Sequence, residues 1–448
     1  MEQKRSKISN WLRNSITARM LIVGFLLLVL LVPLEFVKSL IKERSYRQAE
    51  VVREINSKWG NEVMLMGPIL RIPYKTFNER SVFDEKSKTY HTSTETIVKN
   101  AYLLPDSLNI EADAKYLKRN RTIYESVVFT ADHSITGNFP AIDFSHEGID
   151  PSNILWDKIA VEIRTSNLKG IRNSVAVQLG DKTLTMTPKY DQNYLNIIES
   201  GAIEGFSEEN NSPQNFSFNL KINGSESLKY IPLGIATNVS MDSNWHSPSF
   251  DGSPLPIEET KSISQDGFHA NWQAFQINRQ FQQQFLGTMP DLSEFAFGTN
   301  FVIPVDEYQK SERTAKYGFM VIGLTLLVFL LIQIVSKIYI HPFQYVMIGL
   351  ALVMFYTLLI SISEHSNFFK AYGIAALAVL GLITIYSRAI LKGFKFPILI
   401  CTSLASLYGF IYVIIQLENY ALLVGSIGLF AILAIIMFAS RKIDWGNE

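Results

Sequence analysis

The chain has 448 residues, and its 41 Lys and Arg residues balance its 41 Asp and Glu residues. Because the net charge is zero, the chain has no overall attraction to nucleic acid, and we expect no nucleic-acid partner. The single cysteine, Cys401, lies in an apolar run, which excludes disulfides and thiolate metal sites from the polar part of the chain.

The chain begins with a basic segment, 1–19, which is followed by the apolar run Met20–Val37. At ~1.5 Å per residue, this run is long enough to cross a hydrocarbon core of ~30 Å. A cleaved signal peptide is the rival interpretation, but the following sequence, LVPLEFVKSLIKER, contains no A-x-A-like cleavage site. The sequence therefore predicts an uncleaved membrane helix over 20–37.

Residues 38–60 continue the helical pattern beyond this span. Ile41, Val52, Ile55 and Trp59 are separated by charged residues, as on a helix with one apolar face. Gly60 is typical of a helix C-terminus. We therefore expect a helical extension over 38–60.

The next segment, 61–316, is polar and changes to a period of two. Phe216–Ile222 alternates apolar and polar residues, Asn223-Gly224 is typical of a type I′ turn, and Ser227–Ile231 then predicts a returning strand. Similar runs occur at 122–130, 158–163, 175–179 and 234–241. Short strands with frequent turns predict a β-rich, sandwich-like domain or a similar antiparallel architecture, and the length allows two subdomains.

Five further apolar runs of membrane-spanning length occupy residues 317–440. They cover about 317–336, 343–363, 369–387, 396–416 and 420–440. The predicted fold class is thus an integral membrane α-helical bundle of about six spanning helices, with a large extracytoplasmic β-rich domain inserted between helices 1 and 2.

Basic residues mark one side of this arrangement. Lys and Arg occur in 1–19, at Lys337, in the loop that contains Arg388, Lys392 and Lys395, and in the tail 441–448. The opposite short loops, 364–368 and 417–419, carry Glu364, His365 and Glu418 instead. Since basic loops stay in the cytoplasm, both termini are predicted to be cytoplasmic and 61–316 to lie outside.

The sequence contains no familiar catalytic motif. The seven His residues lack metal-ligand spacing, and there is no G-x-S-x-G elbow, Walker A loop or dinucleotide fingerprint. We therefore predict no cofactor, no metal and no catalytic residue, and catalysis is the less favoured hypothesis.

Three patches in the polar segment are informative. Gly67 and Pro68 within MGPILRIPY suit a sharp turn before a buried strand. Trp245 and His246, in NWHSPSF, belong either to the core or to an exposed aromatic partner site. Residues 267–272, GFHANW, alternate in a way that favours a core strand over a recognition surface.

A fourth patch lies at the outer end of the third span, where Ser361, Glu364 and His365 occur together. Ionisable residues near membrane depth are candidates for function, although a solvated helix end is the simpler interpretation. The basic residues just before the second span could pair with Glu364, and they are Lys310, Arg313 and Lys316. No charge lies in the middle of the later spans, which disfavours a transporter.

These motifs resemble those of the inner membrane protein CreD family, also called cell envelope integrity protein CreD. The resemblance runs along the chain through MGPILRIPY, SNWHSPSFDGSPLP, GFHANW, YQKSERTAKYGF, HPFQYVMIGLALVMFYTLLISISEH and RKIDW. It implies a Gram-negative inner-membrane protein with a periplasmic domain and a role in envelope integrity and stress response. The family has no agreed catalytic residues, so the resemblance implies no site.

Two hypotheses for the function follow. The first is a non-catalytic envelope protein whose periplasmic domain binds an envelope protein, lipid or glycan while its helices lie in the lipid bilayer. The second is a membrane enzyme or lipid-handling protein that acts through Glu364 and His365 at the periplasmic face. A deep pocket with converging polar groups would favour the enzyme, and an exposed aromatic patch would favour the binding module.

Overall fold

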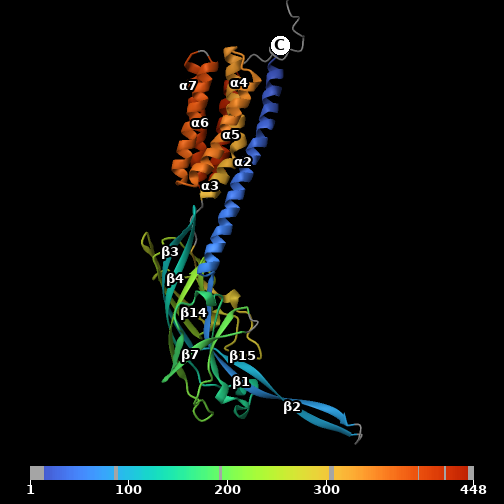
Figure 1. Cartoon of the computed structure of the whole chain (residues 1–448), viewed down its shortest axis with the longest axis vertical. Helices are drawn as coiled ribbons and strands as arrows, with labels where there is room; N and C mark the ends of the chain where they lie inside the picture. The colour runs from blue at the N-terminus through green and yellow to red at the C-terminus, as the bar shows by residue number, and fades with distance from the viewer. Residues whose placement is uncertain are drawn as a thin grey trace, which may run out of the picture. The chain divides into compact units, whose positions relative to one another are not determined.

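The structure is a computed structural model that describes residues 15–84, 89–190, 194–301, 307–391, 393–417 and 420–441 (Figure 1). The chain divides into two compact units. Val51–Pro304 form the first, called here the β-unit, and the residues up to Glu50 and from Val305 onward form the second, the helical unit.

The helical unit supplies helices of membrane-spanning length. Six helices in the described ranges are long and apolar enough to cross a membrane, which confirms the predicted number and order. They are α2 (Ile16–Trp59), α4 (Gly318–Ser336), α5 (Pro342–Ser363), α6 (Phe368–Ile390), α7 (Lys395–Gln416) and α8 (Ala421–Ser440). The short helix α3 (Glu307–Lys316) precedes α4.

Local sequence explains where two of these helices begin. The Nδ1 atom of His341 accepts a hydrogen bond from the Phe343 amide at 3.2 Å, and Pro342 occupies the first helical position of α5. The side chain of Asn367 accepts from the Lys370 amide at 3.0 Å and caps α6 in the same way.

Glycines allow α2 to pack closely against α4 and α5. A Cβ atom on Gly349 would lie 2.1 Å from a methyl group of Leu30, and one on Gly318 would lie 2.7 Å from Leu34. Small residues at such contacts bring helix backbones close together, which is a main source of helix association in membranes.

The β-unit contains one mixed sheet of sixteen strands in the described ranges. The strands are β1 (Val63–Asp84), β2 (Thr89–Leu103), β3 (Ser107–Arg121), β4 (Tyr124–Phe139), β5 (Ala160–Thr165), β6 (Ala176–Leu179), β7 (Lys182–Lys189), β8 (Asn196–Ser200), β9 (Gln214–Ser225), β10 (Ser227–Tyr230), β11 (Ala236–Ser243), β12 (Pro248–Asp251), β13 (Ser262–Ser264), β14 (Gly267–Phe275), β15 (Gln284–Leu286) and β16 (Phe297–Phe301). Most neighbours are antiparallel, but β1–β10 and β3–β11 are parallel, which the sequence did not predict.

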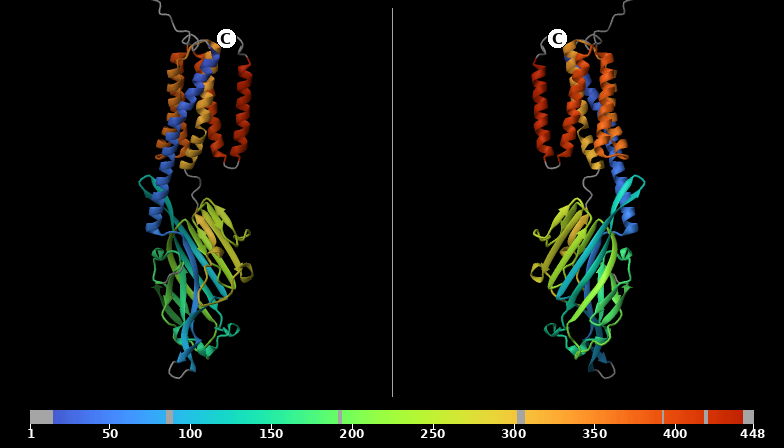
Figure 2. Two further views of the ribbon diagram at one scale, coloured as in Figure 1. Left: turned by 90° about the vertical axis from the view of Figure 1, so that its right-hand side faces the viewer. Right: turned by 90° about the vertical axis from the view of Figure 1, so that its left-hand side faces the viewer.

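The sheet folds back on itself into two layers, as the sandwich-like prediction required (Figure 2). One layer contains β6, β9, β4, β3, β11 and β14, and the other contains β8, β5, β1, β10 and β16. Strand β7 pairs with β6 of the first layer and β8 of the second. Aromatic rings meet between the layers: Phe129 lies 4.9 Å from Phe301, and Trp272 lies 6.2 Å from Phe297, measured between ring centroids.

The predicted hairpin at Asn223-Gly224 is wrong. Both residues lie inside β9, and the chain turns two residues after Gly224, at Glu226, which has φ +65°. From there it crosses to β10 in the other layer. Gly224 is needed for packing rather than for a turn, because a Cβ atom there would lie 2.4 Å from Phe129 and 2.5 Å from Val63.

The predicted sharp turn at Gly67-Pro68 is also wrong. Both residues lie within β1, and the pairing with β5 shifts register between Met66 and Ile69. An extra residue in one strand forms a bulge, and glycine with its positive φ of +135° suits such a position.

Candidate functional site

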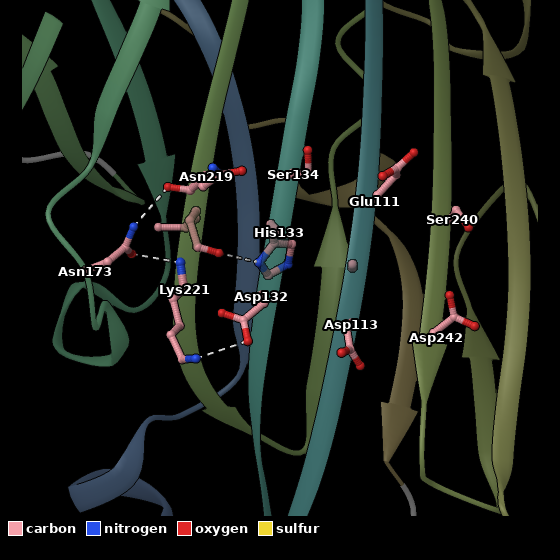
Figure 3. A pocket seen from close by; sticks show the side chains of 12 residues that line it. Glu111, Asp113, Asp132, His133, Ser134, Asn173, Asn219, Lys221, Ser240 and Asp242 are labelled. Atoms are coloured by element: carbon pink, nitrogen blue, oxygen red, sulfur yellow. Dashed lines mark hydrogen bonds and ion pairs between the residues drawn. The ribbon is translucent and has the colours of Figure 1, made fainter. Parts of the chain in front are cut away.

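An open hollow of about 720 Å³ lies on the outer face of the layer that contains β9, β4, β3 and β11 (Figure 3). Alternate residues of these strands point outward, and they are polar. The residues that define this polar hollow are Glu111, Asp113, Asp132, Ser134, Asn219, Lys221, Ser240 and Asp242.

The strand register aligns charged residues in one row across the hollow. Lys221 pairs with Asp132, Asp132 with Asp113, Asp113 with Asp242, and Asp242 with His269 on the neighbouring strand β14. Three aspartates on adjacent strands are therefore direct neighbours, an arrangement that costs sheet stability.

Neighbouring side chains offset part of this repulsion. The Lys221 ammonium lies 3.1 Å from Asp132, and Nδ1 of His269 lies 2.8 Å from Asp242. Lys115, two residues along β3, lies 2.9 Å from Asp113. These pairs are largely exposed, so water and salt screen them, and the row remains accessible to a ligand.

The adjacent row is neutral and rich in hydrogen-bonding groups. Asn219, Ser134, Glu111 and Ser240 follow one another across the same four strands, with Glu111 as the only charge. At the rim, Asn173 donates to the Asn219 carbonyl at 3.1 Å and accepts from the Lys221 amide at 2.8 Å, as Figure 3 shows. The hollow thus offers many donors and acceptors on a rigid sheet.

His133 lies beneath the hollow rather than in it, because its ring is buried in the core. Its Nδ1 atom donates to the Leu220 carbonyl at 3.1 Å, and its Nε2 atom accepts from the Tyr230 hydroxyl at 2.9 Å. Burial lowers the pKa of His133 to about 4, so the ring is neutral at pH 7.

The polar hollow presents the groups of a polar binding surface. In the part of the chain that the structure describes, no group of three or more His, Cys, Asp or Glu residues could hold a metal ion. Among the same residues, neither Ser134 nor Ser240 is hydrogen-bonded to a histidine or carboxylate that could activate it. Its groups can bind hydroxyl, amide and cationic groups of a partner.

A second polar cluster lies in the core of the β-unit, around Glu162. This carboxylate is fully buried and lies 2.8 Å from Arg164, 3.1 Å from Lys189 and 3.4 Å from Arg71. Glu199 bridges Arg71 and Lys189 on the other side. We call these five residues the Glu162 cluster. The sequence AVEIRT around Glu162 gave no signal that its charged residues would be buried, so sequence analysis missed it.

Trp245 is a core residue, which agrees with the first of the two interpretations of the NWHSPSF segment and not with an exposed aromatic site. Its side chain is 3% exposed, packs edge-on against Tyr116 at 4.8 Å, and donates to the Ser247 carbonyl at 2.8 Å. His246 is exposed beside it. Trp272 is buried as well, which confirms the core-strand prediction for β14.

Glu364 has different partners from those predicted. Its Oε1 atom accepts from the Tyr308 hydroxyl at 3.4 Å and lies 3.6 Å from Nε of Arg44 in α2. Neither interaction involves the predicted cations Lys310, Arg313 and Lys316.

The geometry of α3 explains this correction. Its buried face contains Tyr308, Ser311, Thr314 and Ala315, whereas Lys310, Arg313 and Lys316 recur every three residues along another face. Lys316 instead lies 3.4 Å from Glu312. Ser361 and His365 are exposed. The structure therefore brings Glu364 together with Tyr308 and Arg44, and it leaves Ser361 and His365 at the surface.

Comparisons with known proteins cover both units. Residues 15–446 match the family model described as "Inner membrane protein CreD". A curated relative from Escherichia coli (strain K12), named "Inner membrane protein CreD", is 30% identical over 422 residues, which are 93% of this chain and 91% of the relative.

Proposed function

The chain belongs to the CreD family of inner membrane proteins, and from this premise we propose that it is a non-catalytic protein of the cell envelope. It supports envelope integrity and the stress response by binding a polar envelope component through the polar hollow of the β-unit. The helical unit holds it in the lipid bilayer.

The row of three aspartates carries this proposal. Asp132, Asp113 and Asp242 lie directly opposite one another on neighbouring strands, where like charges destabilise a sheet. A surface arrangement that lowers the stability of the sheet and has no role in packing the core is typical of a functional surface. A partner with hydroxyl and amino groups would complete the hydrogen bonds of the row and offset its charge.

The location of the hollow is part of the same proposal. The basic loops and tail favour cytoplasmic termini and a periplasmic β-unit. Reporter fusions after Glu448 and at 340–342 should give a cytoplasmic signal, whereas an insertion in the exposed segment 208–210 should give a periplasmic one. A cytoplasmic signal from 208–210 would overturn the location.

Charge removal tests the binding role. The triple substitution Asp113→Asn, Asp132→Asn and Asp242→Asn keeps side-chain shape and removes the row of charges. We expect normal protein abundance and increased sensitivity of cells to envelope stress. A control that also replaces three exposed carboxylates by amides, Glu147→Gln, Glu258→Gln and Asp266→Asn, lies outside the hollow and should behave as wild type.

Full stress resistance in the triple variant would contradict the proposal. The substitution Glu364→Gln then discriminates between the hypotheses, because it changes the contact with Tyr308 and Arg44 in the helical unit. Lost function in that variant, with the aspartates dispensable, would favour a lipid-handling protein or membrane enzyme.

A further inference from the structure

A second hollow of about 650 Å³ lies in the β-unit and shares no lining residue with the polar hollow. Two 3-10 helices, η5 (Gln276–Asn278) and η6 (Ser293–Phe295), and the short strand β15 build its walls. We call it the Arg279 hollow, after the cation that lines it.

The walls combine aromatic rings with planar polar groups. Phe281 and Phe295 are half-buried and meet edge to face at 5.0 Å. The amides of Gln276, Gln280 and Gln282 are exposed around them. Aromatic faces pack against the C–H face of a sugar ring, and amides form paired hydrogen bonds with acetamido and vicinal hydroxyl groups.

Arg279 adds a buried positive charge to this hollow. Its side chain is 7% exposed and donates to the carbonyls of Leu233 at 2.9 Å and Gly234 at 3.2 Å, and to the Gln283 side chain. Its guanidinium stacks over Phe281 at 4.0 Å. These contacts hold the cation in one position.

No carboxylate of the described residues forms an ion pair with Arg279, and its Nε atom has no hydrogen-bond partner among them. Burial lowers its pKa to about 10, which still leaves it charged at pH 7. A buried cation without a counter-ion is costly, so this position favours a ligand that brings an anionic group.

The carboxylates of Asp291 and Glu294 line the same hollow but are exposed. They can accept hydrogen bonds from hydroxyl or amide groups at the outer end of a ligand. The hollow therefore has an aromatic wall, a buried positive end and an outer acceptor rim.

We propose that the Arg279 hollow binds a saccharide that carries acetamido groups and a carboxylate. The sugar ring packs on Phe281 and Phe295, the carboxylate lies toward Arg279, and the glutamine amides bind the acetamido groups. This site is separate from the polar hollow, so either proposal can fail while the other holds.

Two disaccharides that differ in one carboxylate-bearing lactyl group test the ligand class. Titration calorimetry on the full-length protein in detergent would compare N-acetylglucosaminyl-N-acetylmuramic acid with chitobiose, which has the same two rings without the acid. We expect the acidic disaccharide to bind about tenfold more tightly. Absence of binding, or equal affinity for the two sugars, would overturn the proposal, as would equal affinity for an acidic dipeptide.

Three variants test the position of the site. Phe281→Ala should weaken binding of the acidic disaccharide about tenfold. Gln280→Ala changes an exposed side chain, so the fold should persist while the affinity falls. Phe77→Ala removes an exposed phenylalanine of β1 that does not line the hollow, and it should bind as wild type. Wild-type affinity in both Phe281→Ala and Gln280→Ala would overturn the assignment.

Discussion

The helical unit and the β-unit differ in the polar groups that they bury. Among the described residues, the buried polar side chains of the helical unit are neutral, such as Gln333, which accepts from the Tyr345 hydroxyl at 2.6 Å. The β-unit instead buries charged side chains, namely Glu162, Arg164 and Arg279.

The difference follows from the solvent of each unit. A helix in hydrocarbon forms all of its backbone hydrogen bonds within itself. A charge inside the membrane costs several kcal/mol, so the polar contacts between such helices are made by neutral hydroxyls and amides. A β-unit in water can surround a buried carboxylate with three cations, because the sheet register brings distant residues together. Stability in the β-unit should therefore depend on individual charges, and in the helical unit on close packing.

The largest effect is expected for Glu162→Ala. This change leaves Arg71, Arg164 and Lys189 without their shared carboxylate, and breaking a buried pair costs about 3–5 kcal/mol. The midpoint of thermal loss of the β-sheet circular dichroism signal should fall by about 10 °C. The control Glu258→Ala removes an exposed partner of Lys261 and should leave the midpoint unchanged. An unchanged midpoint in Glu162→Ala would show that the stability of the β-unit does not depend on this buried charge.

Acid should destabilise the β-unit through His133. Burial lowers its pKa to about 4 in the folded chain, against about 6.5 when unfolded, so the unfolded state binds the proton more tightly. The neutral, buried His133 therefore contributes about 3 kcal/mol to the free energy of unfolding. This contribution is complete above pH 6.5 and is lost as the pH falls from 6.5 to 4. Denaturant melts of wild type and His133→Gln at pH 7 and pH 4.5 check this. A pH dependence that is the same in both proteins would refute it.

Gly349→Leu should disturb the helical unit by overpacking. The new side chain would clash with Leu30 of α2, at a cost of about 1–3 kcal/mol. Gly373→Leu is the matched control, since no atom lies within 4 Å of the position of its Cβ. Thermal melts of the helical signal should distinguish the two variants, and Leu30→Ala should restore the first. Equal stability of the two glycine variants would show that close packing of α2 is not needed.

The smallest effect is expected for Tyr345→Phe, which deletes the hydroxyl that donates to Gln333. Hydrogen bonds between membrane helices contribute about 0.6 kcal/mol on average, so the melting midpoint should barely move. A loss as large as that for Glu162→Ala would abolish the contrast between the two units.

Periodicity and hydropathy predicted the six helices, the β-rich insertion and the core strand at 267–272, because those signals depend on local burial alone. Pairing partners depend on the register of distant strands and helices. Asn223-Gly224 has the composition of a turn, yet Gly224 is there to pack under Phe129. Arg44 meets Glu364 from another helix, and the Glu162 cluster joins four strands, so no local pattern marked either site.

The parallel pairing of β1 with β10 has a consequence for folding. Val63 pairs with Leu228, and β10 in turn pairs with β16, near the end of the β-unit. Closing such long loops delays folding, because the entropy of closure is lost before the contacts form. The edge of β1 that pairs with β10 therefore stays open until most of the β-unit has been synthesised, and in that interval it is exposed to chaperones or to misassembly.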